Sequence, residues 1–283
     1  MVIFKIASDL HHYLQPLRIK DKQIGFVPTM GALHKGHISL IEQCKLKNTI
    51  TVCSIFVNPT QFNDVKDFDK YPITIEQDIL LLEEAGCDVL FLPSYQEVYP
   101  QPSDTEKKYD LGFVETVFEG AHRPGHFNGV CMVVERLLRI VQPHQLFLGQ
   151  KDYQQCIVIK KLIEIMQVDI SVKISSTQRE ANGLAMSSRN RRLNEIQLAQ
   201  AATIYQSFIY IKDNLTQQNA IHLIEQAKLI LLNNGFDRID YFSFANAKTL
   251  EPIEFWDGET PLVALVAAFM GEVRLIDNML LTN

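Results

Sequence analysis

The stretch Gly25-Phe-Val-Pro-Thr-Met-Gly-Ala-Leu-His-Lys-Gly-His-Ile-Ser-Leu-Ile41 decides the fold of this chain. Residues 23–27 have the pattern of a short buried strand, and Pro28 and Gly31 are expected to end it. From about Gly36 onward, the apolar residues follow the spacing of an amphipathic helix. The stretch therefore predicts a strand, a tight turn and a helix, the unit from which α/β sheets are built.

Two histidines lie between that strand and that helix, in the element His34-Lys-Gly-His37. If the helix has begun there, the two imidazoles lie on one face of its first turn. That turn also offers unpaired backbone N–H groups and the positive end of the helix dipole, which bind anions. Gly36 has no Cβ, so a ligand can approach the backbone closely. The element suits a triphosphate attacked at its α-phosphorus, although two histidines in a loop are usually ordinary surface residues.

Composition is that of an ordinary globular protein of 283 residues, with 47% hydrophobic and 21% charged residues. The net charge of -6 argues against a nucleic-acid partner, but a pocket can still be locally basic. The five cysteines have no C-x-x-C spacing, which indicates reduced core thiols of a cytoplasmic protein. No signal pattern is present, and the most apolar run, 262–270, is too short to cross a bilayer, so no membrane partner is expected.

Strand and helix patterns alternate through the first 175 residues. They predict strands at 23–27, 49–57, 87–92, 145–148 and 170–174, and helices beginning near 36 and at 74–86, 127–141 and 153–166. Residues 74–77 have a capping-box pattern, and the loose alternation at 107–119 predicts an extended excursion or hairpin. Such repeats predict a Rossmann-like, doubly wound parallel sheet with right-handed crossovers, which binds ligands at the carboxyl ends of its strands.

After about residue 176 the pattern changes. It predicts helices at 194–214 and 219–233, followed by strands at 241–244, 262–269 and 274–280. We therefore expect two domains, a Rossmann-like ligand-binding domain of residues 1–176 and a smaller C-terminal α+β domain of residues 177–283.

Four further stretches are rich in polar residues and lie beside predicted strands or helices. They are residues 57–62, 119–128, 148–155 and 185–191. Each has an ordinary alternative, such as a plain turn at Asn58-Pro59 or a helix-capping serine beside solvated arginines. Because they gather at the ends of one predicted sheet, they favour a single phosphate-binding site. The residues alone indicate an α/β nucleotide-dependent transferase or ligase.

The blocks PTMGALHKGH, FVNPTQF, RPGHFNGV, LGQKDYQQ and REANGLAMSSRNRRL, in this order, closely resemble the pantoate–β-alanine ligase family over essentially the whole chain. Members form an acyl-adenylate from pantoate and ATP, releasing pyrophosphate, and the amine of β-alanine then attacks to give pantothenate and AMP. The resemblance implies a cytoplasmic, homodimeric ligase of pantothenate biosynthesis that uses Mg²⁺ with ATP. Residues 1–176 would bind ATP and pantoate, and residues 177–283 would form a lid.

The resemblance also implies a role for each matching residue. The ATP-binding residues would be Met30, His34, His37, Gly149, Lys151, Asp152, Met186, Ser187, Ser188 and Arg189. The residues that bind pantoate or β-alanine would be Pro28, Thr29, Met30, Asn58, Gln61, Arg123, His126 and Gln155. Among these, His37, His34, Lys151 and Arg189 would be catalytic, with His37 facing the α-phosphate. Asp78 resembles the family's Mg²⁺-linked carboxylate, and residues 61–69 and 186–189 are candidate lid segments.

Two other functions are compatible with part of this pattern. A cytidylyltransferase-like enzyme shares the H-x-G-H element but does not explain the amide pair Gln61 and Gln155. A non-catalytic nucleotide-binding module has no use for Arg123 and Asp78. The chain departs from the family pattern at three places, which are Ile73, Cys131-Met132 and Asn182.

Overall fold

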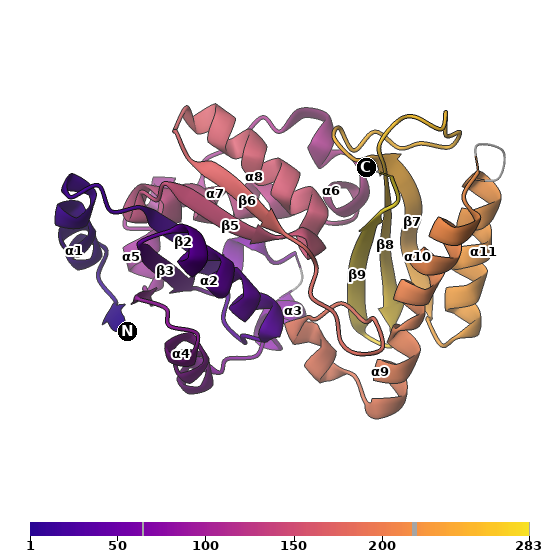
Figure 1. Cartoon of the computed structure of the whole chain (residues 1–283), viewed down its shortest axis with the longest axis horizontal. Helices are drawn as coiled ribbons and strands as arrows, with labels where there is room; N and C mark the ends of the chain where they lie inside the picture. The colour runs from indigo at the N-terminus through magenta and orange to yellow at the C-terminus, as the bar shows by residue number, and fades with distance from the viewer. Residues whose placement is uncertain (64, 217–219, 283) are drawn as a thin grey trace. The chain divides into compact units, whose positions relative to one another are not determined.

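The computed structural model describes residues 1–63, 65–216 and 220–282. The chain forms two compact units. One unit comprises Met1–Gly149 and Gln154–Ser176, and the other comprises Gln150–Tyr153 and Thr177–Asn283. The first unit contains a parallel sheet and the second an antiparallel sheet (Figure 1).

The sheet of the first unit has six parallel strands in the order β1-β4-β3-β2-β5-β6. The strands are β1 (Val2–Phe4), β2 (Ile24–Thr29), β3 (Ile50–Ile55), β4 (Val89–Phe91), β5 (Gln145–Gly149) and β6 (Ser171–Ser175). The chain runs outward from β2 through β3 to β4 and begins again at β5, on the other side of β2. The predicted doubly wound parallel sheet is confirmed, and its topological switch point lies between β2 and β5.

Helices cover both faces of this sheet. The longer helices are α1 (Ala7–Ile19), α2 (Lys35–Lys47), α4 (Ile75–Glu84), α7 (His126–Val141) and α8 (Tyr153–Met166). Because side chains alternate along a strand, Phe26 and Leu146 pack with α1, α7 and α8. Their neighbours Val27 and Phe147 face the opposite way and pack with α2 and α4. Figure 1 shows α4 and α8 on opposite sides of the sheet.

Short segments connect these elements. They are η1 (Pro59–Gln61), α3 (Val65–Asp69), α5 (Tyr95–Val98), η2 (Pro102–Thr105), η3 (Gly112–Glu115), α6 (Phe118–His122), η4 (Gln150–Asp152) and η5 (Ser188–Arg192), where η marks a 3₁₀ turn. Residue 64, which falls within the candidate lid segment 61–69, lies outside the described residues.

Pro28 was expected to end its strand. It lies inside β2 instead, because this strand continues to Thr29. The His144 backbone N–H donates to the Ile24 carbonyl, so Ile24, Phe26 and Pro28 direct their backbone groups toward β5. The pairing of β2 with β5 stops at Phe26. The N–H group that proline lacks therefore falls where the ladder has already ended, and the strand can continue to Thr29.

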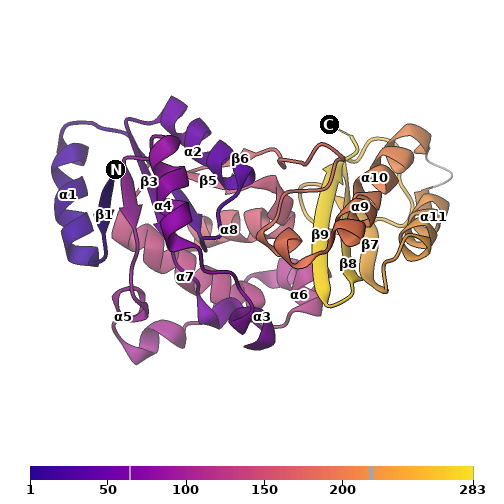
Figure 2. The same cartoon turned by 90° about the horizontal axis from the view of Figure 1, so that it is seen from below.

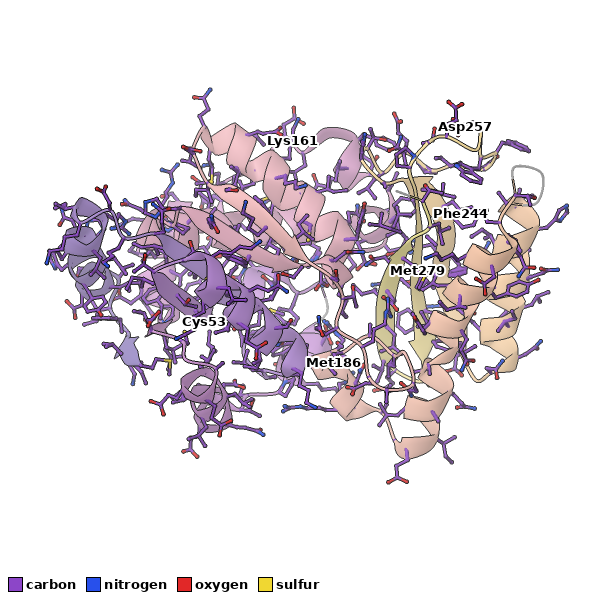
Figure 3. All side chains as sticks on the ribbon, viewed as in Figure 1. Cys53, Lys161, Met186, Phe244, Asp257 and Met279 are labelled. Atoms are coloured by element: carbon purple, nitrogen blue, oxygen red, sulfur yellow. The ribbon has the colours of Figure 1, made fainter. Side chains whose placement is uncertain are left out.

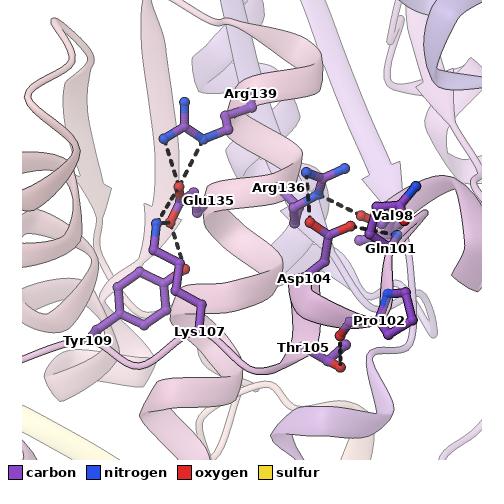
Figure 4. Close-up of polar contacts among 10 residues, drawn as sticks. All are labelled: Val98, Gln101, Pro102, Asp104, Thr105, Lys107, Tyr109, Glu135, Arg136 and Arg139. Carbon is purple, nitrogen blue, oxygen red and sulfur yellow. Dashed lines mark hydrogen bonds and ion pairs between the residues drawn. The ribbon is translucent and has the colours of Figure 1, made fainter.

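The predicted extended excursion at 107–119 is wrong, because this segment contains η3 and the start of α6 and no strand. A buried carboxylate on α7 holds it instead (Figure 4). Glu135 accepts hydrogen bonds from the Lys107 ammonium at 2.6 and 2.8 Å and from the Tyr109 hydroxyl at 2.6 Å. Arg139 donates to the same carboxylate at 2.8 Å. These side-chain bonds replace the strand pairing that the alternation suggested.

In the second unit, β7 (Arg238–Asn246), β8 (Leu262–Met270) and β9 (Val273–Leu280) form an antiparallel sheet in that order. Helices α10 (Thr203–Asn214) and α11 (Ala220–Asn233) pack on one side of it (Figure 2). Phe208 of α10 stacks on Phe242 of β7 with ring centroids 5.5 Å apart. The predicted α+β pattern is confirmed, although residue 219, where one helix was expected to start, lies outside the described residues.

The single helix expected at 194–214 is two helices, α9 (Glu195–Ala201) and α10. Between them lies the single residue Ala202, whose φ of -61° and ψ of -18° are still in the right-handed helical region. Ala201 and Ala202, at this break, are both buried. Among the described residues, no helix is both long enough and apolar enough to span a membrane.

Candidate active site

The two histidines of the H-x-G-H element lie at the start of α2, directly after β2. His34 is the N-cap of α2, and its Nδ1 accepts a hydrogen bond from the Gly36 backbone N–H at 3.1 Å. Nδ1 of His37 accepts from the His34 backbone N–H at 3.4 Å, and the two ring centroids are 4.1 Å apart. Because each Nδ1 is an acceptor, each neutral ring carries its proton on Nε2. The local fold thus makes two neighbouring rings into Nε2–H donors.

Asp78 of α4 builds the turn that leads to these histidines. Its Oδ2 accepts from the Ala32 backbone N–H at 2.9 Å, and its Oδ1 accepts from that of Leu33 at 2.8 Å. Gly31 and Ala32 are in the left-handed region, with φ 80° and 49°, so the turn is one that a non-glycine residue rarely adopts. The Thr74 hydroxyl donates to Oδ1 at 3.1 Å instead of capping α4, so the predicted capping box is not formed.

The geometry of Asp78 does not fit the Mg²⁺ role that the resemblance implied. Both carboxylate oxygens already accept backbone hydrogen bonds, and the residue is 0% exposed. Mg²⁺ prefers octahedral oxygen ligation with several waters, which needs open space around the carboxylate. Within the described part of the chain, no group of three or more His, Cys, Asp or Glu side chains could hold a metal ion. The contacts that the structure gives Asp78 therefore position the turn that leads to the two histidines.

Gln61 lies at the end of η1, which follows β3, and its side chain faces Met30. Its Nε2 lies 2.6 Å from the Met30 sulfur, so the segments after β2 and β3 meet at this pair. Asn58, at the start of η1, is buried at 1% exposure. Its Nδ2 donates to the Gly129 carbonyl at 3.2 Å, and its Oδ1 accepts from the Tyr99 hydroxyl at 3.1 Å. Asn58 thus anchors the turn that presents Gln61.

Arg123 and His126 also act on this turn, through the backbone carbonyl of Gln61. Nδ1 of His126 donates to that oxygen at 2.7 Å, and Arg123 donates to it at 3.5 Å. Arg123 further contacts His126 Nε2 at 3.1 Å. A Cβ at Gly129 would lie 2.3 Å from the Thr60 carbonyl oxygen, so only glycine lets η1 lie this close to α7. In the first unit these residues position Gln61.

Thr29 and Pro28 complete the end of β2. The Thr29 hydroxyl donates to the Ser54 carbonyl at 2.7 Å and accepts from the Gly31 backbone N–H at 3.3 Å. Its side chain is therefore used within the fold, and Met30 is the first residue after β2 whose side chain is half-buried and faces another predicted site residue.

At the switch point, β5 ends at Gly149, and an added Cβ there would meet no atom within 4 Å. Two adjacent glutamines follow on α8. Gln154 is buried and is used by the fold, since it accepts from the Glu119 backbone N–H at 2.9 Å and donates to two carbonyls. Gln155 is half-buried, and its side-chain amide has no hydrogen bond to any residue that the structure describes. Of the pair, Gln155 is therefore the amide available to a ligand.

The remaining predicted residues belong to the second unit. Lys151 lies 3.6 Å from the Asp152 carboxylate within η4. Ser187 caps η5, because its hydroxyl oxygen accepts from the Arg189 backbone N–H at 3.2 Å. Met186, labelled in Figure 3, precedes this turn, and its backbone N–H donates to the Gln178 carbonyl at 2.9 Å. This unit thus carries a lysine and an arginine on two separate short turns.

The structure brings part of the predicted set together. It also shows two residues that were not predicted and that hold segments of the site. Met30, His34, His37 and Gln61 follow the neighbouring strands β2 and β3 of the first unit. Tyr99 and Gln154 were not predicted, although each holds a segment that carries a predicted residue. No local pattern marks them, because their partners lie 41 and 35 residues away in the sequence.

A family model described as Pantoate-beta-alanine ligase matches residues 2–280. A pantothenate synthetase from Cytophaga hutchinsonii is 42% identical over 283 residues, covering 99% of each chain. A pantothenate synthetase structure from Thermus thermophilus superposes with a TM-score of 0.91, 35% identity and 100% coverage of both chains. A pantoate-beta-alanine ligase structure from Francisella tularensis, complexed with beta-gamma ATP and beta-alanine, has a TM-score of 0.80 and 35% identity, covering 99% of this chain and 98% of that one.

Proposed function

The chain belongs to the pantoate-beta-alanine ligase family, and from this we propose that it is an enzyme that joins pantoate to β-alanine at the expense of ATP. The products are pantothenate, AMP and pyrophosphate. The observation that carries the proposal is the pair of histidines at the start of α2, whose Nδ1 atoms both accept backbone N–H groups, at the switch point of a doubly wound sheet. Such a position binds the phosphates of a nucleotide.

The first step is adenylation. A carboxylate oxygen of pantoate attacks the α-phosphorus of ATP, the bond from that phosphorus to the bridging oxygen breaks, and pyrophosphate leaves with the electron pair. His37 and His34 donate hydrogen bonds to the phosphate oxygens on which charge develops. Alignment of the two substrates supplies most of the remaining acceleration, so no side-chain nucleophile is needed.

The second step transfers the pantoyl group. The uncharged amine of β-alanine attacks the acyl carbon, AMP leaves with the former carboxylate oxygen, and the amine loses a proton. Gln61 and Gln155 hold the hydroxyl and carboxyl oxygens of pantoate, and Met30 lies at the reaction centre. Asn58, Arg123 and His126 support this pocket from behind, as their contacts to η1 suggest.

Lys151 and Arg189, with Ser187 and Ser188, hold the β- and γ-phosphates and stabilise the departing pyrophosphate. The resemblance assigns Met186, Gly149 and Asp152 to the nucleoside, and a Cβ at Gly149 would meet no atom within 4 Å. Mg²⁺ would enter as part of the nucleotide substrate, because both oxygens of the buried Asp78 carboxylate already accept backbone N–H groups.

From the resemblance we also propose a domain division, an oligomeric state and a cellular compartment. The domains divide near residue 176, with residues 177–283 as a lid to which residues 150–153 also belong. The enzyme is a homodimer, which sedimentation velocity would test. It works in the cytoplasm, where the five buried thiols would stay reduced.

The test of the proposed function follows labelled oxygen. Pantoate labelled with ¹⁸O in its carboxylate should pass one ¹⁸O atom to AMP, and labelled pyrophosphate should exchange into ATP without β-alanine. A ligase that forms an acyl phosphate would instead release ADP and place the label in inorganic phosphate. Label in phosphate, or exchange that requires β-alanine, would overturn the adenylate mechanism.

A further inference from the structure

A buried asparagine on β9 holds the turn that carries Lys151. Asn278 is 2% exposed, and its Nδ2 donates to the carbonyls of both Gln150 and Lys151 at 2.9 Å. Its Oδ1 accepts from the Gln150 side-chain amide at 3.2 Å. Both amide hydrogens and the amide oxygen of Asn278 are therefore used by this one turn of three residues.

The residue before it, Asp277, is the buried partner in an ion pair with Arg179, which is half-buried. Arg179 donates to its two carboxylate oxygens at 2.6 and 3.1 Å, in the parallel two-bond arrangement that fixes both position and orientation. Asp277 also accepts from the Asn278 backbone N–H at 2.8 Å, and Arg179 donates to the Asn278 carbonyl at 3.2 Å. Hydrogen bonds therefore hold Asp277 and Asn278 in fixed positions relative to Arg179.

Arg179 in turn fixes the segment that leads to Arg189. It donates to the Gly183 carbonyl at 3.1 Å, and its guanidinium lies 4.6 Å from the centroid of the Tyr205 ring. Its backbone forms an antiparallel bridge with Ala185, which immediately precedes Met186. The Asn190 side chain donates to the Ala185 carbonyl at 3.0 Å, so the same residues also hold η5.

The geometry points to Arg179, Asp277 and Asn278 as positioning residues that fix the Lys151 turn and the 186–189 segment to one another. The inference rests on the proposed function, which assigns Lys151 and Arg189 to the ATP phosphates. It goes beyond that function because none of the three residues need touch a substrate. A triphosphate is recognised by cations at a defined spacing, and this cluster sets that spacing within the second unit.

Simple stabilisation of the fold does not account for the pattern of contacts. A side chain that only joins two elements needs one good hydrogen bond between them. Asn278 instead uses both amide hydrogens and its amide oxygen on the backbone and side chain of η4. Supporting contacts of this kind preserve the orientation of the group that binds the ligand. The expected consequence of losing them is poor placement of Lys151 in a chain that is still folded.

The experiment is a double-mutant cycle in the full-length enzyme, read out by pyrophosphate exchange with saturating pantoate. Asn278→Ala should lower the exchange by about 10- to 100-fold, the cost expected for a misplaced catalytic group. In the Lys151→Ala background the same change should have little further effect, because the group that it positions is already gone. The KM for pantoate should change little. Gln150→Ala, which removes only one of the three contacts, should give a smaller loss with the same non-additivity.

Asn246→Ala is the matched control. Its side-chain oxygen also accepts two backbone hydrogen bonds in the second unit, from Lys248 and Thr249 at 2.8 and 3.3 Å, but on neither phosphate-binding segment. It should leave exchange unchanged.

If Asn278→Ala does not fold, Gln150→Ala alone decides the matter. Additive losses in the cycle, or an equal loss in Asn246→Ala, would overturn the positioning role. A wild-type enzyme without exchange would instead refute the proposed function itself.

Discussion

At the scale of single residues, the two imidazoles at the start of α2 are shaped by the backbone around them. The backbone N–H groups of Gly36 and His34 occupy Nδ1 of His34 and His37. The tautomer that follows places the ring proton of each histidine on Nε2. Donor atoms are thus prepared before any substrate binds, which is the form of electrostatic stabilisation that costs least during the reaction.

His37→Ala should therefore lower turnover by about 100- to 1000-fold, the scale for losing one donor aimed at developing charge. The thermal midpoint should change little, because the hydrogen bond that the ring accepts from the His34 backbone N–H is long, at 3.4 Å. Steady-state kinetics and calorimetry check both points, with the exposed His12→Ala as the control. Near-normal turnover of His37→Ala would remove this residue from the mechanism.

Asp78→Asn separates a positioning role from a metal-binding role. The amide offers one oxygen where the turn needs two, so the N–H of Ala32 or Leu33 loses its acceptor. We expect a loss of about 1–3 kcal/mol in the free energy of unfolding, with reduced turnover. The Mg²⁺ concentration for half-maximal activity should stay the same. Normal stability with a higher Mg²⁺ requirement would restore the metal role, and exposed Glu76→Gln on the same helix serves as the control.

The neighbouring glutamines of α8 allow a paired comparison. Gln155→Ala should weaken pantoate binding by about 1–3 kcal/mol, because substrate oxygens lose a partner in a desolvated pocket. It should leave the stability unchanged. Gln154→Ala should instead lower the stability, since its amide holds Glu119 and two carbonyls. Titration calorimetry with pantoate and with ATP distinguishes the two, and equal losses for both ligands in Gln155→Ala would mean that it does not belong to the pantoate pocket.

At the scale of elements, α7 serves both the core and the site. Its start presents His126 and Gly129 to η1, and the middle of the helix carries Glu135, which holds residues 107 and 109. Burial alone would raise the pKa of Glu135, but hydrogen bonds from Lys107, Tyr109 and Arg139 outweigh it and lower the pKa to about 2. The segment between α5 and α6 is thus held to α7 by the Glu135 carboxylate, which stays ionised at acidic pH.

This low pKa predicts how stability depends on pH. Between the unperturbed value of 4.5 and the folded value of about 2, the unfolded chain binds a proton that the folded chain does not. The contribution of Glu135 is therefore fully present above pH 4.5 and is lost as the pH falls toward 2. Urea unfolding over the acid range between these two pKa values should show a shallower pH dependence in Glu135→Gln than in the wild type or in exposed Glu83→Gln. Equal slopes in all three would contradict the assignment.

At the scale of the whole molecule, the order of the chain does not follow the division into units. Residues 150–153 belong with residues 177–283, although their neighbours on both sides in the sequence belong to the first unit. Asn278 binds this short turn across 127 to 128 residues of sequence. The chain therefore places Gly149 in one unit and Lys151 in the other, two positions apart.

Removal of divalent metal should affect the reaction and not the fold. The described ranges contain no group of three or more His, Cys, Asp or Glu side chains that could hold an ion, so dialysis against EDTA should leave the thermal midpoint unchanged while it stops turnover. Titration of the enzyme with Mg²⁺ should show binding only when ATP is present. A midpoint that falls after EDTA treatment would reveal a structural metal site.

The sequence by itself determined the parallel sheet, the change to an α+β pattern after residue 176 and the family. These features are encoded locally, in β-branched runs, helical spacing and contiguous motif blocks, so each can be recognised within a short window. Only the tertiary structure decided what several motif residues do. Asp78 contacts a turn 45 to 46 residues away, and His126 contacts Gln61 across 65. Whether a polar side chain binds a ligand or holds a backbone depends on such distant partners, because each side chain has few donors and acceptors and the fold determines which groups lie within their reach.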